Sequence, residues 1–132
     1  MSEILQPAGW AFPKGYSNGI TTQGRLVVTA GQIGWNPETC QFETDDFAAQ
    51  TAQALKNVVA VLREAGAEPH HLVRLTWYIT DKAVYLASQR EIGRAYREVI
   101  GKHFPAMSVV VVAGLLEDRA KVEIEGTAVV GE

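Results

Sequence analysis

The spacing of apolar residues along the chain predicts two long helices. Residues 46–65 carry an apolar or small side chain at every third or fourth position, the repeat of one helix face. This face consists of Phe47, Thr51, Leu55, Val58, Leu62 and Ala65. Asp45 or Asp46 can cap this helix at its start, and Gly66 can end it in the left-handed conformation. A second helix is predicted over residues 83–102, with a face made of Tyr85, Gln89, Ile92, Tyr96 and Val99.

Alternation of apolar and polar residues predicts two strands that are buried on one side only. Residues 72–80 place one set of side chains on each face: Val73, Leu75, Trp77 and Ile79 against Arg74, Thr76 and Tyr78. Residues 121–130 do the same with Val122, Ile124 and Ala128 against Glu123, Glu125 and Thr127. Each strand therefore has one apolar and one polar face.

Shorter segments complete the predicted order. Residues 19–22 and 25–33 predict two strands joined at Gln23-Gly24, because both are rich in β-forming residues. The apolar run 109–113 is short enough for a buried strand, and residues 34–44 form a loop. The resulting β-β-α-β-α-β-β order predicts an α+β sandwich, with two helices on one face of a mixed sheet and the other face open.

The open face would carry the polar sides of the strands at residues 72–80 and 121–130. A small domain cannot bury such a mixed surface in its own core, but it suits a wet interface between subunits. The pattern therefore predicts an oligomer.

Composition and charge narrow the class of protein. A chain of 132 residues with ordinary hydrophobic and charged content predicts a single domain, residues 1–132. The net charge of −3, without a Lys/Arg stripe, gives no electrostatic footprint for nucleic acid. The chain has neither a signal-peptide pattern nor the roughly 20 apolar residues of a membrane span. With Cys40 as the single cysteine, these features predict a cytoplasmic protein without nucleic-acid or membrane partners.

Five short segments resemble the Rid family (YjgF/YER057c/UK114), and they occur in the family's order. They are Gly15-Tyr16-Ser17 for G-P-Y-[SV], Thr29-Ala30-Gly31-Gln32-Ile33 for T/V-S-G-Q-[IL], Asn36-Pro37-Glu38-Thr39 for N-P-x-T-G, residues 50–66 for Q-[TA]-x-[QN]-[AS]-L-x-N-[VL], and Val122-Glu123-Ile124-Glu125 for V-E-I-E. Ala30 replaces a serine and Cys40 a glycine. The resemblance extends over nearly the whole chain.

The resemblance implies a chorismate-mutase-like α+β domain that assembles as a homotrimer, with small-metabolite sites in clefts between subunits. Many relatives deaminate imines and enamines without a metal or organic cofactor. Carried over to this chain, the cleft would contain Tyr16, Ala30, the Gly31 backbone, Met107 and Glu123. Glu123 would position a water molecule and shuttle a proton.

Met107 is where this chain departs from the deaminases, which carry arginine in F-P-A-R-S. A thioether cannot form the bidentate pair with which that arginine grips a substrate carboxylate. Met107 therefore argues against 2-aminoacrylate-type substrates. Together with Trp35 in the loop after Gly34, it suggests a more apolar, aromatic-accepting pocket. Sequence alone does not place Arg25, Arg74 or Arg119 in the cleft as a substitute.

Each candidate residue also has a structural interpretation. Glu123 can be a solvated carboxylate on a polar strand face, and Tyr16, Trp35 and Met107 can serve in packing. His70-His71 beside Pro69 predict a surface turn, because no carboxylate or cysteine accompanies them at metal-ligand spacing.

Two functions therefore stay open for this chain. The first is a hydrolase acting on an imine, an enamine or a related reactive metabolite, distinct from the arginine-dependent deaminases. The second is a non-catalytic trimer that binds a metabolite or a partner protein.

Overall fold

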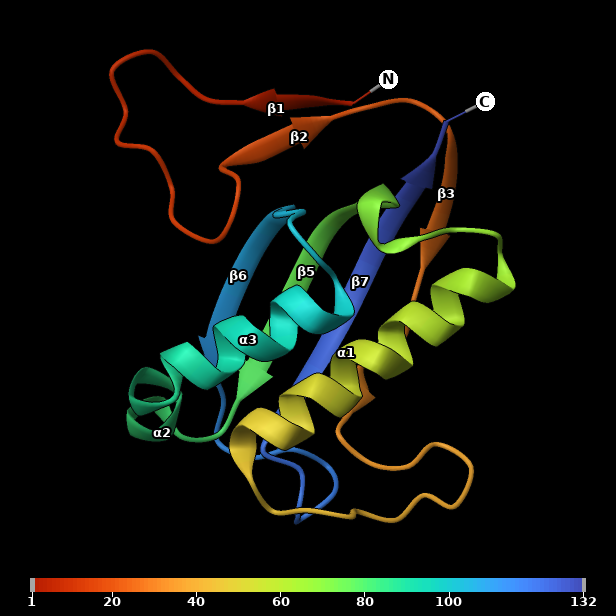
Figure 1. Ribbon diagram of the computed structural model, residues 1–132, viewed down its shortest axis with the longest axis vertical. Helices are drawn as coiled ribbons and strands as arrows, with labels where there is room; N and C mark the ends of the chain where they lie inside the picture. The colour runs from red at the N-terminus through yellow and green to blue at the C-terminus, as the bar shows by residue number, and fades with distance from the viewer. Residues whose placement is uncertain (1, 132) are drawn as a thin grey trace.

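The computed structural model describes residues 2–131 and contains a five-stranded mixed sheet with helices on one face (Figure 1). Its strands are β3 (Arg25–Val28), β4 (Gln32–Ile33), β5 (Leu72–Ile79), β6 (Ala106–Val111) and β7 (Val122–Val130). The strand order is β3-β7-β5-β6, and β4 also pairs with β7. Strand β6 runs parallel to β5, whereas the other pairs are antiparallel. The predicted α+β class is confirmed; the first and last residues of the predicted domain 1–132 lie outside the described residues.

Helix α1 (Phe47–Glu64) begins and ends where its local signals predict. The Asp46 carboxylate accepts a hydrogen bond from the Ala49 amide at 2.9 Å, and Gly66 adopts a φ of +74° just beyond the last turn. In Figure 1, α1 lies beside α3 (Gln89–Val99) across one face of the sheet. The two helices and the sheet enclose one cluster of buried apolar side chains, whose largest members include Leu55, Leu62, Leu72, Leu75, Ile79 and Ile124.

The predicted second helix is divided in two, and this part of the prediction is wrong. Helix α2 (Lys82–Ala87) is capped by Asp81, whose carboxylate accepts from the Val84 amide. At Ser88 the backbone leaves the helical conformation, and α3 begins at the next residue. Helix α3 stops before the predicted residue 102, because Gly101 takes a φ of +96°. Within residues 2–131 the fold therefore has three α-helices, besides the short 3₁₀ turn η1 (Pro69–His71).

The predicted strand at residues 25–33 is interrupted between β3 and β4. Thr29 bonds Gly126 of β7 twice: its amide donates to the Gly126 carbonyl at 2.9 Å, and its hydroxyl accepts from the Gly126 amide at 3.0 Å. Ala30 and Gly31 then leave the ladder. Strand β2 (Gly19–Thr21) pairs with β1 (Glu3–Leu5) and not with β3, so the two predicted neighbours do not form a hairpin.

Strand β6 occurs near its predicted place but is not buried. It starts at Ala106, three residues before the predicted strand, and forms an edge of the sheet. The side chains of Val109, Val110 and Val111 are 40%, 43% and 51% exposed. The apolar run therefore belongs to a surface that this chain does not cover by itself.

The two alternating strands are confirmed, with one shift. In β7, Val122, Ile124 and Ala128 are buried while Glu123, Glu125 and Thr127 are only half-buried. In β5 a register irregularity between Leu72 and Arg74 brings Leu72, rather than Val73, onto the buried face. Both α1 and α3 lie on the near side of the sheet in Figure 1, which leaves the polar face without a helix in the described part of the chain.

Over residues 2–131 the fold has no helix long and apolar enough to cross a membrane.

Candidate functional site

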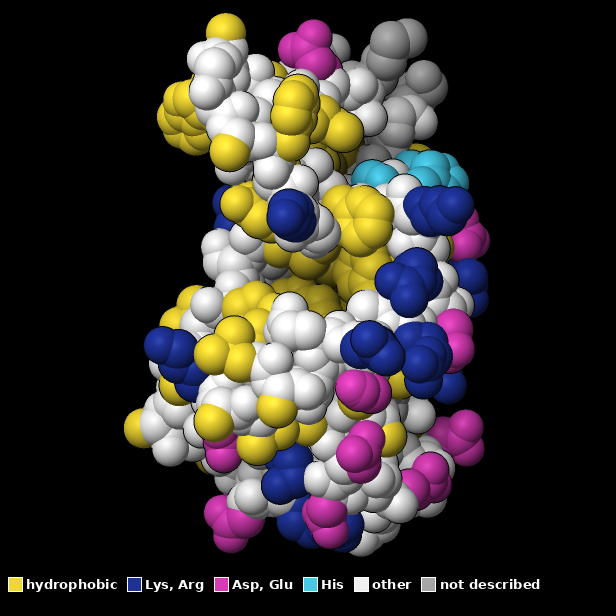
Figure 2. Space-filling model, turned by 60° about the vertical axis from the view of Figure 1, so that its left-hand side comes forward, with side chains coloured by type: hydrophobic (Ala, Val, Ile, Leu, Met, Phe, Trp, Pro, Cys, Tyr) yellow, Lys and Arg dark blue, Asp and Glu magenta, His cyan; other side chains and the backbone are white. Residues whose placement is uncertain are grey.

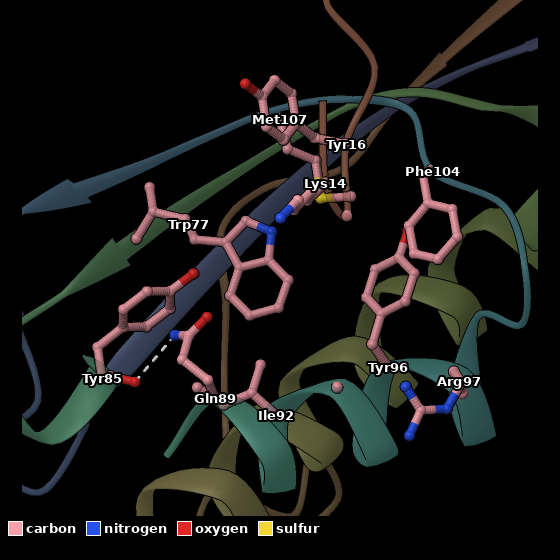
Figure 3. Close-up of a pocket in the computed structure, with 13 residues that line it drawn as sticks. Lys14, Tyr16, Trp77, Tyr85, Gln89, Ile92, Tyr96, Arg97, Phe104 and Met107 are labelled. Carbon is pink, nitrogen blue, oxygen red and sulfur yellow. Dashed lines mark hydrogen bonds between the residues drawn. The ribbon is translucent and has the colours of Figure 1, made fainter. Parts of the chain in front are cut away.

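A cavity of about 520 Å³ lies between α3 and the strands β5 and β6. Figure 2 shows a hollow walled by hydrophobic side chains on this side of the molecule. The cavity is lined from three directions: the sheet supplies Trp77, Met107 and Val109, the helices supply residues that include Tyr85, Gln89, Ile92 and Tyr96, and the N-terminal segment supplies Lys14, Gly15 and Tyr16 (Figure 3). Its size is in the range of small-metabolite sites.

Met107 enters the cavity because of its register in the sheet. Met107 is the direct partner of Leu75 in the parallel β5–β6 pair, and directly paired residues point to the same face. Leu75 is fully buried against the helices. Met107 therefore points to the helix side of the sheet, where it contributes an apolar, polarizable side chain to the cavity wall.

Stacked aromatic rings form one wall of the cavity. The ring of Tyr96 stacks on Phe104, with centroids 5.5 Å apart and planes 11° apart, and lies 6.4 Å from the ring of Trp77. The Tyr96 hydroxyl donates to the His103 carbonyl at 2.5 Å. A tyrosine is uncharged at neutral pH, and burial raises the pKa of Tyr96 further above it. This wall of the cavity is therefore aromatic and neutral.

The charged groups of the lining are all cations, while its neutral polar groups, amide and hydroxyl, can both donate and accept. Lys14 and Arg97 both line the cavity, and no carboxylate is among the lining residues. Gln89 contributes an amide, whose nitrogen donates to the Tyr85 carbonyl at 3.0 Å. A chain with a net charge of −3 thus surrounds this cavity with positive charge only.

The predicted catalytic residue belongs to a second cluster, on the polar face of the sheet. The carboxyl carbon of Glu123 would lie 2.7 Å from a methyl group placed on Gly31, so the carboxylate rests against the glycine. On the same face, the Tyr78 hydroxyl donates to Glu125 at 2.5 Å. This hydrogen bond raises the pKa of Tyr78, with smaller effects of burial and of the charges of Glu125 and Glu123. The structure therefore places Glu123 and Met107 on opposite faces of one sheet.

Comparison with known proteins identifies the family. A family model described as Endoribonuclease L-PSP matches residues 10–130. The chain is 37% identical to a 2-iminobutanoate/2-iminopropanoate deaminase of Escherichia coli over 109 residues, which cover 80% of each protein. It belongs to the Rid family.

Further relatives agree with this assignment of the Rid chain. A RutC family protein of Pasteurella multocida is 37% identical over 106 residues, covering 80% of this chain and 81% of the relative. A conserved Rid family protein of Yersinia pestis, whose function is unknown, superimposes with a TM-score of 0.85 at 30% identity, and the match covers 98% of both chains. The resemblance inferred from the five sequence segments is therefore confirmed.

The remaining site residues of this Rid protein are divided between the two regions. Tyr16 lines the cavity with Met107, whereas Gly31 lies beside Glu123. Ala30 is exposed next to Gly31. Trp35 does not line the cavity, because its ring packs against Phe42 with centroids 5.8 Å apart.

The three arginines considered from sequence are engaged elsewhere. Arg25 donates to the Ala65 carbonyl at the end of α1, and Arg119 pairs with Asp45 and lies over the Phe42 ring. Arg74 is exposed on the polar face and lines a separate, smaller hollow. The cations at the cavity are instead Lys14 and Arg97, which sequence reasoning missed.

Two other cavity residues carried a signal in the sequence. Gln89 is the polar member of an otherwise apolar helix face, and Trp77 is a tryptophan at an inward strand position. Neither signal distinguishes a cavity wall from the core.

Over residues 2–131 no three His, Cys, Asp or Glu side chains gather as a metal site. His71 accepts a hydrogen bond from the Glu68 amide in the predicted surface turn, and desolvation lowers the pKa of this histidine.

Proposed function

We propose that this Rid protein hydrolyses an imine or enamine at a centre shared by two subunits of a cytoplasmic homotrimer. The proposal is supported by the 37% identity to a 2-iminobutanoate/2-iminopropanoate deaminase. It is supported further by the position of Glu123 and of the cavity on opposite faces of the sheet. Within one chain the Glu123 carboxylate and the cavity are separated by the sheet. In an oligomer, the polar face of a second copy would bring its Glu123 to the mouth of the cavity.

The reaction needs a proton relay and a held water molecule. Protonation of an enamine at carbon gives the iminium ion, and an imine reaches the same ion by protonation at nitrogen. Water held by Glu123 then adds to the iminium carbon while the carboxylate takes a proton from it. Glu123 returns this proton to the nitrogen of the carbinolamine. As the C–N bond breaks, ammonia leaves and the hydroxyl proton passes to solvent, which replaces the proton taken up to form the iminium ion and leaves a carbonyl. One water is consumed, one ammonia is released, and Glu123 ends ionised.

Met107 limits which imines this centre accepts. Loss of a buried charged hydrogen-bond pair to a substrate carboxylate costs about 2–5 kcal/mol, or roughly 30- to 5,000-fold in rate. Small 2-imino acids such as 2-aminoacrylate are therefore expected to be poor substrates. Met107→Arg should improve their turnover.

The first test is ammonia release from imines generated in situ by an amino-acid oxidase, measured above the uncatalysed rate. Glu123→Gln keeps the size of the side chain but removes the base, so it should lower turnover by about 10²- to 10⁴-fold. Glu125→Gln, two residues along the same face, is the matched control and should stay near wild type. Absence of catalysis on every imine, or equal rates in the two variants, would contradict the hydrolase proposal.

The shared centre is tested by mixing two inactive variants. Met107→Trp fills the cavity and leaves Glu123 intact, whereas Glu123→Gln leaves the cavity intact. If each centre takes its cavity from one subunit and its carboxylate from the next, random mixed trimers should recover about a quarter of wild-type activity. Mixed assemblies that stay inactive would refute the shared centre.

A non-catalytic metabolite-binding trimer is the second candidate, and Met107 is the observation that favours it. In that case the cavity binds its ligand equally well in wild type and Glu123→Gln, and ammonia is never released. Gain of deaminase activity in Met107→Arg alone would assign the protein to this class.

A further inference from the structure

We propose that the cavity selects a planar, conjugated carboxylic acid, and that the indole N–H of Trp77 donates a hydrogen bond to its carboxylate. The reaction of such a molecule depends on the function proposed above, but its binding does not.

The indole nitrogen of Trp77 is a buried donor without an acceptor. Trp77 is 4% exposed, and its Nε1 is the one buried side-chain nitrogen or oxygen in residues 2–131 that lacks a hydrogen-bond partner. Indole can only donate, and a buried donor without an acceptor destabilises the folded state. Figure 3 shows this ring among the cavity-lining side chains, with its nitrogen turned toward Lys14. This position therefore lacks an acceptor from the protein, and a ligand in the cavity can supply one.

The charges of the lining specify an anionic acceptor. Lys14 and Arg97 are cations with donor groups only, so neither can accept from the Trp77 nitrogen. A carboxylate accepts from several donors at once and gains from the positive charge, whereas a cationic ligand is repelled. A ligand carboxylate close to Trp77 would thus bind at the floor of the cavity. It would not depend on an arginine at position 107, where this chain has methionine.

The shape of the lining specifies a flat ligand. Tyr96 and Phe104 stack with their planes 11° apart, and the plane of Trp77 is 23° from that of Tyr96. Near-parallel rings give a conjugated molecule flat apolar surfaces to stack on, and the Met107 thioether adds a favourable contact with a ring. A cavity of about 520 Å³ would be largely unfilled by a two- or three-carbon imino acid.

Lys14 is placed to share an anion with the Trp77 donor. In Figure 3 the Lys14 nitrogen is drawn beside the indole nitrogen, and both side chains line the cavity. Lys14 is exposed and belongs to an irregular segment, so its side chain can adjust to pair with a bound carboxylate. Because the indole nitrogen is shielded from solvent, the lining has to rearrange before a ligand reaches it.

The test uses trans-cinnamate, a stable planar carboxylate, and 3-cyclohexylpropanoate, which keeps the carboxylate but is not flat. Titration of ¹⁵N-labelled wild-type protein should move the indole N–H resonance of Trp77 downfield with cinnamate. The resonance of exposed Trp10 should stay in place. Because this measurement uses wild type, it does not depend on whether a variant folds.

Trp77→Phe removes the donor and keeps an aromatic ring, so cinnamate should bind about 10- to 100-fold more weakly. Trp10→Phe is the matched control and should bind like wild type. Equal binding of the two acids, an unmoved Trp77 resonance, or unchanged affinity in Trp77→Phe would overturn the inference. Imine hydrolysis with no effect of cinnamate on Trp77 would refute this inference alone. Cinnamate binding through Trp77 in a protein that releases no ammonia would refute the proposed hydrolase alone.

Discussion

Two glycines three residues apart should respond in opposite ways to the same substitution. A methyl group on Gly31 would lie 2.7 Å from the carboxyl carbon of Glu123, and closer still to one of its oxygens. A methyl group on Gly34 would lie 2.6 Å from the Cα atom of Gln50, in the backbone of α1. Neither glycine has a positive φ, so alanine itself is compatible with both backbones.

Gly31→Ala should affect activity and leave stability nearly unchanged. The Glu123 side chain can rotate until its carboxyl carbon reaches the 3.4 Å of an ordinary contact. Such a rotation destabilises the folded state by about 0.5–1.5 kcal/mol. Alanine also restricts the unfolded chain more than glycine does, which stabilises the folded protein by about 0.4–1 kcal/mol and largely offsets this cost. A catalytic carboxylate displaced by about 1 Å costs on the order of 100-fold in turnover.

Gly34→Ala should reduce stability instead. The backbone of a helix cannot rotate away as a side chain can, so α1 has to shift against the sheet. Overpacking of this kind costs about 1–3 kcal/mol.

The two variants are compared by urea unfolding, followed by far-UV circular dichroism, and by ammonia release from the best imine substrate. We expect Gly31→Ala to unfold at the wild-type midpoint with turnover close to that of Glu123→Gln. Gly34→Ala should unfold earlier and lose activity only in proportion to its unfolded fraction. Full activity in Gly31→Ala would refute the placement of Glu123 in the reaction.

Three further substitutions test local features by their effect on folding. Cys40 has a φ of +58°, so Cys40→Gly should raise the free energy of unfolding by about 1 kcal/mol in a urea titration. Asp46→Ala removes the N-cap of α1 and should lower the free energy of unfolding by about 1 kcal/mol. The same substitution at the exposed neighbour, Asp45→Ala, should change the free energy of unfolding much less. Because the pKa of buried Tyr96 is raised above the usual 10.0, an unfolded chain loses this proton first, and stability present below pH 10 should fall as the pH rises further. Tyr96→Phe should lessen this alkaline loss while losing the hydrogen bond to His103, and an equal slope in both proteins would contradict this account.

Local signals decided which parts of the fold could be predicted. The ends of α1 were predictable because Asp46 and Gly66 act within one turn of the helix. The break at Ser88 was not, because the helical spacing of the predicted face continues across it, from Tyr85 through Gln89 to Ile92. The valines of β6 predict a buried strand although they lie at the sheet edge, because hydrophobicity alone does not distinguish a core strand from an edge strand.

The site was predictable only in part, for a related reason. Alternation correctly placed Trp77 on the inward face of β5, but an inward position borders either core or cavity. Which of the two it borders depends on helix α3 and on Lys14, both distant in sequence. Glu123 and Gly31 become candidates through family resemblance, and their contact depends on the antiparallel pairing of β4 with β7, two strands far apart in sequence that no local pattern joins.

The exposed valines of β6 also affect the tendency of a newly synthesised chain to aggregate. From residue 104 to residue 116 the chain has no charged side chain, and its β-branched centre lies at an open sheet edge. Uncharged edges of this kind are templates for strand addition and fibril growth. In the proposed trimer, assembly would cover such an edge and remove it from competition with strand addition. A variant that cannot assemble should therefore aggregate increasingly as its concentration rises, because its open edges then meet more often.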